Sequence, residues 1–259
     1  MTEPSVVITG ASRGLGRAMA LALAQMGACV ALNARSASAL ARVKDEVERL
    51  GGRAVVAAGD ISQPDVVARL VAVAALRCGG IDTVINNAGR LEPVARIADS
   101  DPVEWRQSLH VNVLAPYLLT QAALPHLRRS RQGRVITLSS GAGLHPVAGW
   151  SAYCVGKAAI NMFTAVLAAE EPWLTALAVR PGRVETDMQR VLREQGASVM
   201  PRETYEDFVA MHRRGALLPP EAPARTLAVL ALHAPGAWSG RFFSWDEADI
   251  QAFASQWLT

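Results

Sequence analysis

A glycine-rich turn between an apolar run and a helical stretch is the feature that most constrains the fold of this chain. The β-branched run Val6-Val7-Ile8 precedes the turn, and a helical pattern from Arg17 to Met26 follows it. Glycines allow the backbone to approach a pyrophosphate at the amino end of a helix. A strand, a glycine turn and a helix in this order are typical of a dinucleotide-binding fold, although one such turn can also be an ordinary connection. The turn reads Thr9-Gly10-Ala11-Ser12-Arg13-Gly14-Leu15-Gly16.

Apolar strands and helices alternate along the whole chain. With 259 residues, of which 51% are hydrophobic, the chain can bury a large core. The similar lengths of its elements favour one α/β domain over residues 1–259, a doubly wound Rossmann-type domain with a parallel sheet of about seven strands flanked by helices. The strands are predicted near residues 5–9, 29–33, 53–58, 83–86, 133–139, 175–180 and 240–244.

A tyrosine and a lysine four residues apart, Tyr153 and Lys157, indicate acid/base chemistry. The chain has 24 arginines but only two lysines, so the ammonium at Lys157 stands out. A helix is predicted from Ser151 to Ala169, which places both side chains on one face. A nearby positive charge favours the ionised form of a phenol, whose pKa is ordinarily about 10. A lone Tyr-x-x-x-Lys is nevertheless common on amphipathic helices, so the pair depends on its context.

Polar residues at the ends of the predicted strands supply that context. Asp60 follows one strand, Asn86-Asn87-Ala88-Gly89 follows the next, Ser139-Ser140 ends another, and Asn112 lies inside a helix. With the glycine turn and the Tyr-x-x-x-Lys pair, these motifs keep a consistent order and spacing across residues 5–188. In these motifs the chain resembles the classical short-chain dehydrogenase/reductase family.

The resemblance implies an NADP(H)-dependent oxidoreductase that transfers hydride between the nicotinamide and a carbonyl or secondary alcohol of a small, largely hydrophobic substrate. It implies that Tyr153 is the general acid/base, and that Lys157 lowers the pKa of Tyr153 and holds the ribose. Ser140 would orient the carbonyl, and Asn112 would extend a proton relay through water held by its backbone and side chain. Ser140 is preferred to Ser139 because thirteen residues separate it from Tyr153, the usual distance in the family.

The preference for NADP(H) rests on the end of the second predicted strand. That strand ends in Leu32-Asn33-Ala34-Arg35, where NAD-binding folds usually carry an acidic residue. Arg35, with Arg13 in the glycine turn, would suit a 2′-phosphate. The alternatives are a solvated strand end for Arg35 and a surface loop residue for Arg13.

Three further cofactor residues have structural alternatives. Asp60 resembles the residue at the adenine but could begin the next helix, Asn87 could brace the sheet, and Thr186 could cap a helix. The full expected cofactor set is Gly10, Ser12, Arg13, Gly14, Leu15, Gly16, Arg35, Asp60, Ile61, Asn87, Ala88, Gly89, Tyr153, Lys157, Pro181, Gly182, Val184 and Thr186.

The substrate residues are expected between Ser140 and Tyr153. The segment contains Leu144, His145, Val147 and Trp150, an apolar and aromatic mixture that suits a hydrophobic ketone, aldehyde or diketone. His145 could orient a substrate oxygen, but a hydrogen-bonded loop histidine is the favoured alternative. The expected substrate set is Ser140, His145, Trp150 and Tyr153.

Residues 188–218 carry no family motif and are a candidate substrate lid, with an inner face of Met200, Tyr205, Phe208 and Met211. Ordinary packing would give the same stripe. Tyr153-Cys154 with Asn161-Met162-Phe163, and the segment 184–189, look like the branch that contains sepiapterin and benzil reductases. The ending Ser239–Asp246 departs from the family's frequent glycine-rich ending.

Charge and composition exclude other classes of function. The net charge is +3, but the arginines are scattered, and the group at residues 128–131 follows a predicted helix, where cations favour the helix dipole, so no nucleic-acid partner is expected. The chain lacks eighteen uninterrupted apolar residues and a signal-peptide pattern. The cysteines Cys29, Cys78 and Cys154 are odd in number and lack metal-ligand spacing, which fits a reducing compartment. A cytoplasmic protein without a metal site is therefore expected.

Two other functions are weighed against a reductase. A non-catalytic NADP(H) sensor on the same fold would usually lose the acid/base residues, which are all present here. An epimerase or dehydratase of the extended family would have a differently spaced glycine turn and a longer chain. The apolar helices predicted at 103–128 and 152–170 could pair with copies of themselves, so a homodimer or homotetramer is expected. The direction of the reaction stays open.

Overall fold

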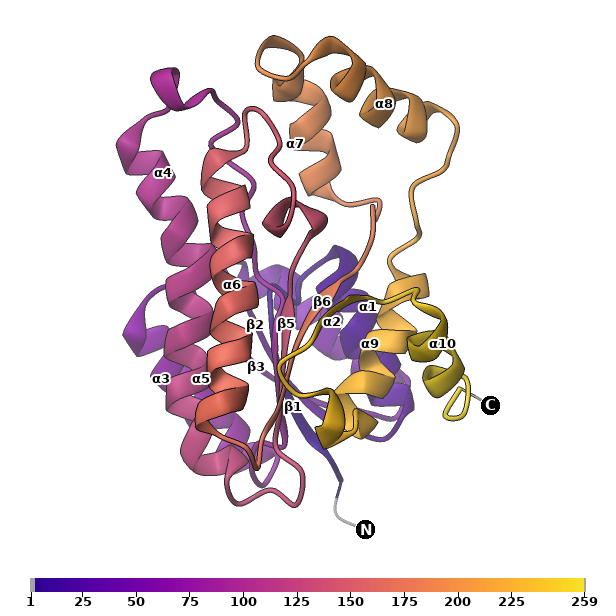
Figure 1. Ribbon diagram of the computed structural model, residues 1–259. Helices are drawn as coiled ribbons and strands as arrows, with labels where there is room; N and C mark the ends of the chain where they lie inside the picture. The colour runs from indigo at the N-terminus through magenta and orange to yellow at the C-terminus, as the bar shows by residue number, and fades with distance from the viewer. Residues whose placement is uncertain (1–2, 259) are drawn as a thin grey trace.

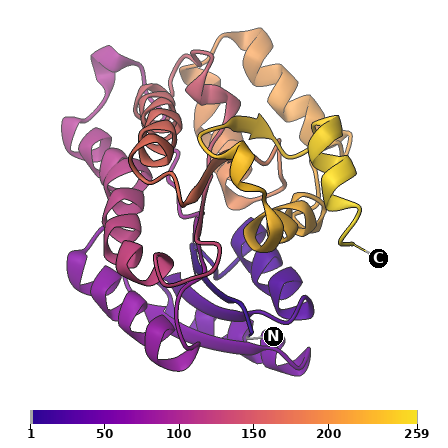
Figure 2. The same ribbon diagram turned by 60° about the horizontal axis from the view of Figure 1, so that its bottom comes forward.

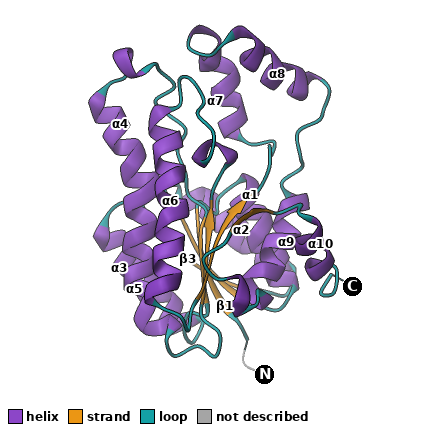
Figure 3. Ribbon diagram, in the orientation of Figure 1, coloured by secondary structure: helices purple, strands orange, loops and turns teal. Residues whose placement is uncertain are grey.

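The computed structural model describes residues 3–258, and its strands form one seven-stranded parallel sheet (Figures 1 and 3). The strand order is β3-β2-β1-β4-β5-β6-β7, so the chain reverses its direction of winding between β1 and β4. In doubly wound sheets, ligands bind at this switch point, beyond the carboxyl ends of the strands. The strands are β1 Ser5–Thr9, β2 Cys29–Ala34, β3 Arg53–Ala58, β4 Thr83–Asn86, β5 Arg134–Leu138, β6 Thr175–Arg180 and β7 Phe242–Ser244.

Helices cover both faces of the sheet (Figure 2). One apolar cluster joins the sheet to α1, α2 and α9, and a second cluster joins its other face to α3, α5 and α6. Figure 1 shows α7 and α8 beyond one end of the sheet. The helices are α1 Gly14–Gln25, α2 Ala37–Arg49, α3 Pro64–Arg77, α4 Pro102–Leu109, α5 Ala115–Leu127, α6 Ser151–Glu170, α7 Asp187–Gln195, α8 Arg202–Arg213, α9 Glu221–His233 and α10 Ala248–Ala254.

The predicted parallel sheet is confirmed, with small changes at the strand ends. Every residue of β1 and β2 is buried, as expected for strands covered by helices on both faces. The last strand begins two residues later than predicted. Gly240 has a φ of +85°, and Arg241 N donates to Trp238 O, so these residues form a turn that precedes β7.

The helix α6 also has the composition of a membrane span. Among residues 3–258 it is the one helix that is long and apolar enough to cross a membrane, with a mean hydropathy of 1.4 over its best window. It packs here on β6 and α4, and the fold buries 39% of that window. Packing on β6 and α4 accounts for the buried part of its apolar surface.

Two of the three cysteines form a disulfide. Cys29 begins β2, Cys78 follows α3, and the bond closes a loop between residues 49 positions apart. Cys154 is the remaining thiol. The odd number of cysteines therefore does not support a reducing compartment, where such bonds are rare. The cytoplasmic location stays a prediction.

We expect reduction of this disulfide to destabilise the protein. A cross-link across a loop of this size contributes about 2–4 kcal/mol, mainly by restricting the unfolded chain. In a chain of this length, a reducing agent should lower the melting temperature by about 5–10 °C. Alkylation of the denatured, unreduced protein should modify Cys154 alone. Three alkylated cysteines would contradict the pairing, and Cys154→Ser is the control that should keep the response to reductant.

Candidate active site

Tyr153 and Lys157 lie one turn apart on α6, on the face that packs into the protein. Their exposed fractions are 7% and 5%, and the Lys157 Nζ lies 5.5 Å from the centre of the Tyr153 ring. Lys157 Nζ donates a hydrogen bond of 2.7 Å to Leu138 O, at the end of β5. The structure therefore places the predicted pair together, at the carboxyl edge of the sheet.

Burial shifts the pKa values of both groups. Desolvation raises the pKa of Tyr153 to about 12, while its hydrogen bond with Ser140 acts in the opposite direction. Desolvation lowers the pKa of Lys157 to about 8. In the protein alone, the pKa of Tyr153 thus moves opposite to the expected direction, because loss of water around the phenol is the largest effect. Lys157 is poised to titrate near neutral pH.

Ser140 and Ser139 have different partners at the end of β5. The Ser140 hydroxyl acts on the Tyr153 phenol, whose pKa it lowers, and its Oγ accepts from Ala142 N at 3.2 Å. Ser139 Oγ instead donates to Asn161 Oδ1 at 2.6 Å. The preference for Ser140 matches this geometry, since Ser139 ties β5 to α6.

Asn112 lies in a π-helical segment, residues 110–114, between α4 and α5. The segment ends just before Pro116, which has no backbone N–H to donate. The side chain is buried, with Oδ1 accepting from Arg90 N at 3.0 Å and Nδ2 donating to Arg90 O at 2.7 Å. A β-carbon on Gly156 would lie 3.1 Å from Asn112 Cβ, so this segment is adjacent to α6. Asn112 Nδ2 also donates to Ser108 Oγ at 3.1 Å, so both of its hydrogens are used, while Oδ1 can still accept one more bond from a water of the expected relay.

The glycine turn leaves the amino end of α1 open. Gly10 and Gly14 have φ of +65° and +52°, which favour glycine, and a β-carbon on Gly16 would lie 2.3 Å from Gly10 O. Within residues 3–258, the N-cap residue Arg13 makes no side-chain capping bond. The first backbone N–H groups of α1 are thus free for an anion, and this cradle fits a dinucleotide pyrophosphate.

Asn87 braces the sheet next to this turn. Its Nδ2 donates to Thr9 O at 2.8 Å and to Gly10 O at 3.2 Å, and its backbone N donates to Thr9 Oγ1 at 3.0 Å. These bonds hold the end of β4 against the turn. The geometry therefore agrees with the alternative in which Asn87 braces the sheet.

The side chain of Asp60 forms hydrogen bonds within its own loop. Its Oδ1 accepts from Ser62 N and from Ser62 Oγ, each at 2.9 Å. Neighbouring Ile61 is buried. The second carboxylate oxygen has no protein hydrogen bond within residues 3–258, so the adenine contact expected at Asp60 stays a prediction.

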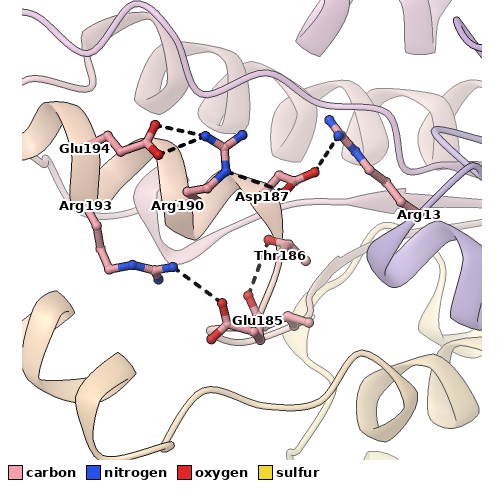
Figure 4. Close-up of polar contacts among 8 residues, drawn as sticks. Arg13, Glu185, Thr186, Asp187, Arg190, Arg193 and Glu194 are labelled. Carbon is pink, nitrogen blue, oxygen red and sulfur yellow. Dashed lines mark hydrogen bonds and ion pairs between the residues drawn. The ribbon is translucent and has the colours of Figure 1, made fainter.

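The two arginines expected at the 2′-phosphate have different partners. Arg35 directly follows β2, is exposed, and forms no ion pair with any other described residue. Arg13 Nη1 lies 2.5 Å from Asp187 Oδ2, at the start of α7 (Figure 4). Arg35 is therefore available to an anion, whereas Arg13 is already paired.

The segment after β6 leads directly to α7. Gly182 has a φ of +79°, and Val184 is buried and forms a β-bridge with Leu218. Two backbone bonds of 2.9 Å, from Glu185 N to Leu218 O and from Leu218 N to Arg183 O, close this bridge. The segment that contains α7 and α8 therefore begins and ends at this bridge, with its two ends side by side.

Thr186 is the N-cap residue of α7 but makes no side-chain capping bond within residues 3–258. Its Oγ1 instead lies 3.4 Å from Val184 O. The capping alternative for Thr186 is therefore not the one observed, and its hydroxyl remains available to a ligand.

Apolar and aromatic residues pack around Tyr153. Trp150 packs edge-on against Tyr153, with ring centres 5.8 Å apart, and Phe208 of α8 lies 5.6 Å from Trp150. Met200 and Tyr205 join the same cluster, so three of the four proposed inner-face residues of 188–218 pack here. Met211 does not, since its sulfur lies beside Arg183. Leu91 and Leu192 also belong to the cluster; no motif in the sequence marks them.

His145 lies away from this cluster. It is exposed and lines a shallow hollow with Leu144, Cys154, Val155 and Ala158, on a different face of α6 from Tyr153. The expectation that His145 contacts substrate is therefore not supported by its position. His145 is a loop residue, as the favoured alternative has it, but within residues 3–258 its side chain makes no hydrogen bond, and only its backbone N donates to Gly141 O at 3.0 Å.

Comparison with known proteins identifies the family. The model for short chain dehydrogenases matches residues 4–197. The chain belongs to the short-chain dehydrogenase/reductase family. Members of this family are oxidoreductases that bind a nicotinamide cofactor, so the chain is an oxidoreductase of this type.

The similar proteins include reductases of one branch. A benzil reductase that forms (S)-benzoin, from Saccharomyces cerevisiae, is 32% identical over 253 residues, which cover 93% of this chain and 95% of the relative. A sepiapterin reductase from Meriones unguiculatus is 39% identical over 205 residues, or 73% and 77% of the two chains. The solved structure of a short-chain dehydrogenase/reductase from S. cerevisiae is 35% identical, with a TM-score of 0.91 over 96% of this chain and 99% of that one. The predicted likeness to the sepiapterin and benzil reductase branch is confirmed.

Proposed function

We propose that this protein is an NADP(H)-dependent carbonyl reductase. The observation that carries the proposal is the burial of Tyr153 and Lys157 one turn apart on α6, where the Ser140 hydroxyl acts on the phenol. A hydroxyl pair of this kind can bind one substrate oxygen from two sides. The open amino end of α1 lies at the same edge of the sheet and would bind the cofactor.

Each residue has a definite task in this proposal. The bound nicotinamide would supply the hydride in reduction or accept it in oxidation. Tyr153 Oη donates its proton to the carbonyl oxygen as the alcohol forms, and takes it back in the reverse direction. Ser140 Oγ donates a hydrogen bond to the same oxygen and fixes its position. The apolar cluster around Trp150 and Phe208 excludes water from the reacting groups.

Lys157 would hold the ribose next to the nicotinamide. Its Nζ can keep the bond to Leu138 O and still donate two more hydrogen bonds. In its protonated form, it also favours the phenolate of Tyr153 in the oxidative direction. A proton could then leave through water held by the backbone of the π-helical segment around Asn112.

The preference for NADP(H) is proposed on the charge at the end of β2. Arg35 is exposed and has no acidic partner within residues 3–258. Arg35→Gln should lower kcat/KM for NADPH by about 10- to 100-fold, the effect of losing charge-assisted hydrogen bonds, and leave NADH nearly unchanged. Arg42→Gln, which removes an exposed arginine of α2, is the matched control. An equal loss with both cofactors would contradict this role.

A panel of carbonyl compounds tests the proposed activity. Oxidation of NADPH and NADH should be followed with diketones, aromatic ketones, pteridines and quinones, because the named relatives are benzil and sepiapterin reductases. Turnover with NADPH that depends on Tyr153 is expected. Nucleotide binding without turnover of any carbonyl would instead support the alternative, a non-catalytic NADP(H) sensor.

We further propose a homo-oligomer that uses the outer surface of α5 and α6. Exposed apolar side chains gather there, and a hollow beside them is lined by Leu114, Tyr117 and Phe163. Met162→Glu should shift the protein toward the monomer in light scattering, since this side chain is 66% exposed. Leu76→Glu on α3, outside this surface, is the control. A wild-type monomer at micromolar concentration would contradict the proposal.

A further inference from the structure

An ion pair joins the amino ends of α1 and α7 across the expected cofactor site. Arg13 precedes α1, Asp187 is the first residue of α7, and their charged atoms lie 2.5 Å apart (Figure 4). The backbone at Gly14 also lies close to the side chain of Thr186, because a β-carbon on Gly14 would lie 3.2 Å from Thr186 Cγ2. The two helix starts thus face the same space.

The carboxylate of Asp187 is held chiefly by Arg13. Its other oxygen lies 3.8 Å from Arg190 Nε, and Arg190 is itself bonded through Nη1 to both oxygens of Glu194, at 2.9 and 3.0 Å. A carboxylate in the first turn of a helix is stabilised by the helix dipole. The carboxylate of Asp187 is therefore already paired with the guanidinium of Arg13, next to the expected cofactor site.

We propose that Asp187 competes with the 2′-phosphate of NADP(H) for Arg13, and thereby weakens the discrimination between NADPH and NADH. This inference rests on the proposed NADP(H) preference. Arg35 has no competitor among residues 3–258, so the two arginines are unequal. Arg35 is always available to the phosphate, whereas Arg13 must first leave Asp187.

The exposure of the pair limits the size of the effect. The side chains of Arg13 and Asp187 are 69% and 42% exposed. Ion pairs this exposed change an equilibrium by no more than about two- to fivefold. NADH has no 2′-phosphate, so breaking the pair should change its affinity much less. A general effect of charge near the pyrophosphate would change both dissociation constants equally. The ratio of the two constants therefore reports only the competition for the 2′-phosphate.

Nucleotide titrations of a double-mutant cycle test the proposal. Dissociation constants for NADPH and NADH would be measured by fluorescence for wild type, Asp187→Asn, Arg13→Gln and the double variant. Asp187→Asn should raise the ratio of the NADH constant to the NADPH constant by about two- to fivefold, and it should have no such effect in the Arg13→Gln protein. Glu194→Gln is the control, because it removes a carboxylate of α7 whose partner is Arg190.

Three results would overturn the proposal. The ratio could stay constant or fall in Asp187→Asn, it could rise equally with Arg13 removed, or it could rise equally in Glu194→Gln. Asp187→Ser, which also removes the charge and suits a helix start, serves if the amide variant does not fold. Failure of the proposed function looks different, because the wild type would then bind neither nucleotide or would not prefer NADPH.

Discussion

Tyr153→Phe is expected to lower kcat for carbonyl reduction by about 10²- to 10⁴-fold, the usual contribution of a general acid. The Tyr153 phenol is buried and acts together with the Ser140 hydroxyl, and phenylalanine keeps the ring that packs against Trp150. The dissociation constant for NADPH and the melting temperature should change little. Steady-state kinetics and nucleotide titration on the same preparations measure both.

The control is Tyr117→Phe, which removes an exposed phenol of α5. It should keep the wild-type rate. A Tyr153→Phe protein that retained more than about a tenth of the wild-type kcat would require another proton donor, and the assignment of Tyr153 would be wrong.

Lys157→Met is expected to separate activity from stability. The variant should lose at least about 10²-fold in kcat/KM, since it removes the cation that serves both Tyr153 and the ribose. The free energy of unfolding at pH 7 should be unchanged or higher. Burial that lowers the pKa of Lys157 from 10.5 to about 8 costs the folded state about 3 kcal/mol at that pH. Lys157→Met removes this cost, but it also removes the hydrogen bond to Leu138 O, which offsets about 1–3 kcal/mol of the stability gained.

The stability difference between the wild type and Lys157→Met should also depend on pH, in a direction set by the pKa of Lys157. Because the pKa of Lys157 is about 8 when folded and 10.5 when unfolded, the unfolded chain binds more protons between these values. The wild type should therefore gain stability relative to Lys157→Met as the pH rises from 8 to 10.5. Urea denaturation at pH 7 and pH 9.5 measures the difference, with Lys44→Met, at a lysine whose side chain is 40% exposed, as the control. A Lys157→Met protein that is several kcal/mol less stable at pH 7 would refute a burial cost.

The fold and the centre of the site could be predicted because their signals are local. The glycine turn around Gly10 and Gly14 requires backbone angles that favour glycine, and the buried strands are written as apolar runs. Tyr153 and Lys157 share a face through helix geometry alone. Once parallel strands align their carboxyl ends, Ser140 reaches the same place.

The remainder depends on contacts that no local pattern encodes. Arg13 meets Asp187 only after α7 is placed, and Cys29 meets Cys78 only after α3 packs on the sheet. The amide of Asn112 is taken by the backbone of Arg90, which its motif does not reveal. His145 shows the converse: it is close to Tyr153 in the chain, but the structure places it on another side of α6.

The bridge between Val184 and Leu218 has an evolutionary consequence. Because the excursion that carries α7 and α8 starts and ends at the same point, its length and side chains can vary without moving β6 or β7. The excursion supplies Leu192, Met200 and Phe208 to the apolar cluster around Tyr153, so these contacts can change while Tyr153 stays in place. We therefore expect that exchange of this segment for that of a relative would change the residues packed on Trp150 and leave Ser140, Tyr153 and Lys157 in place.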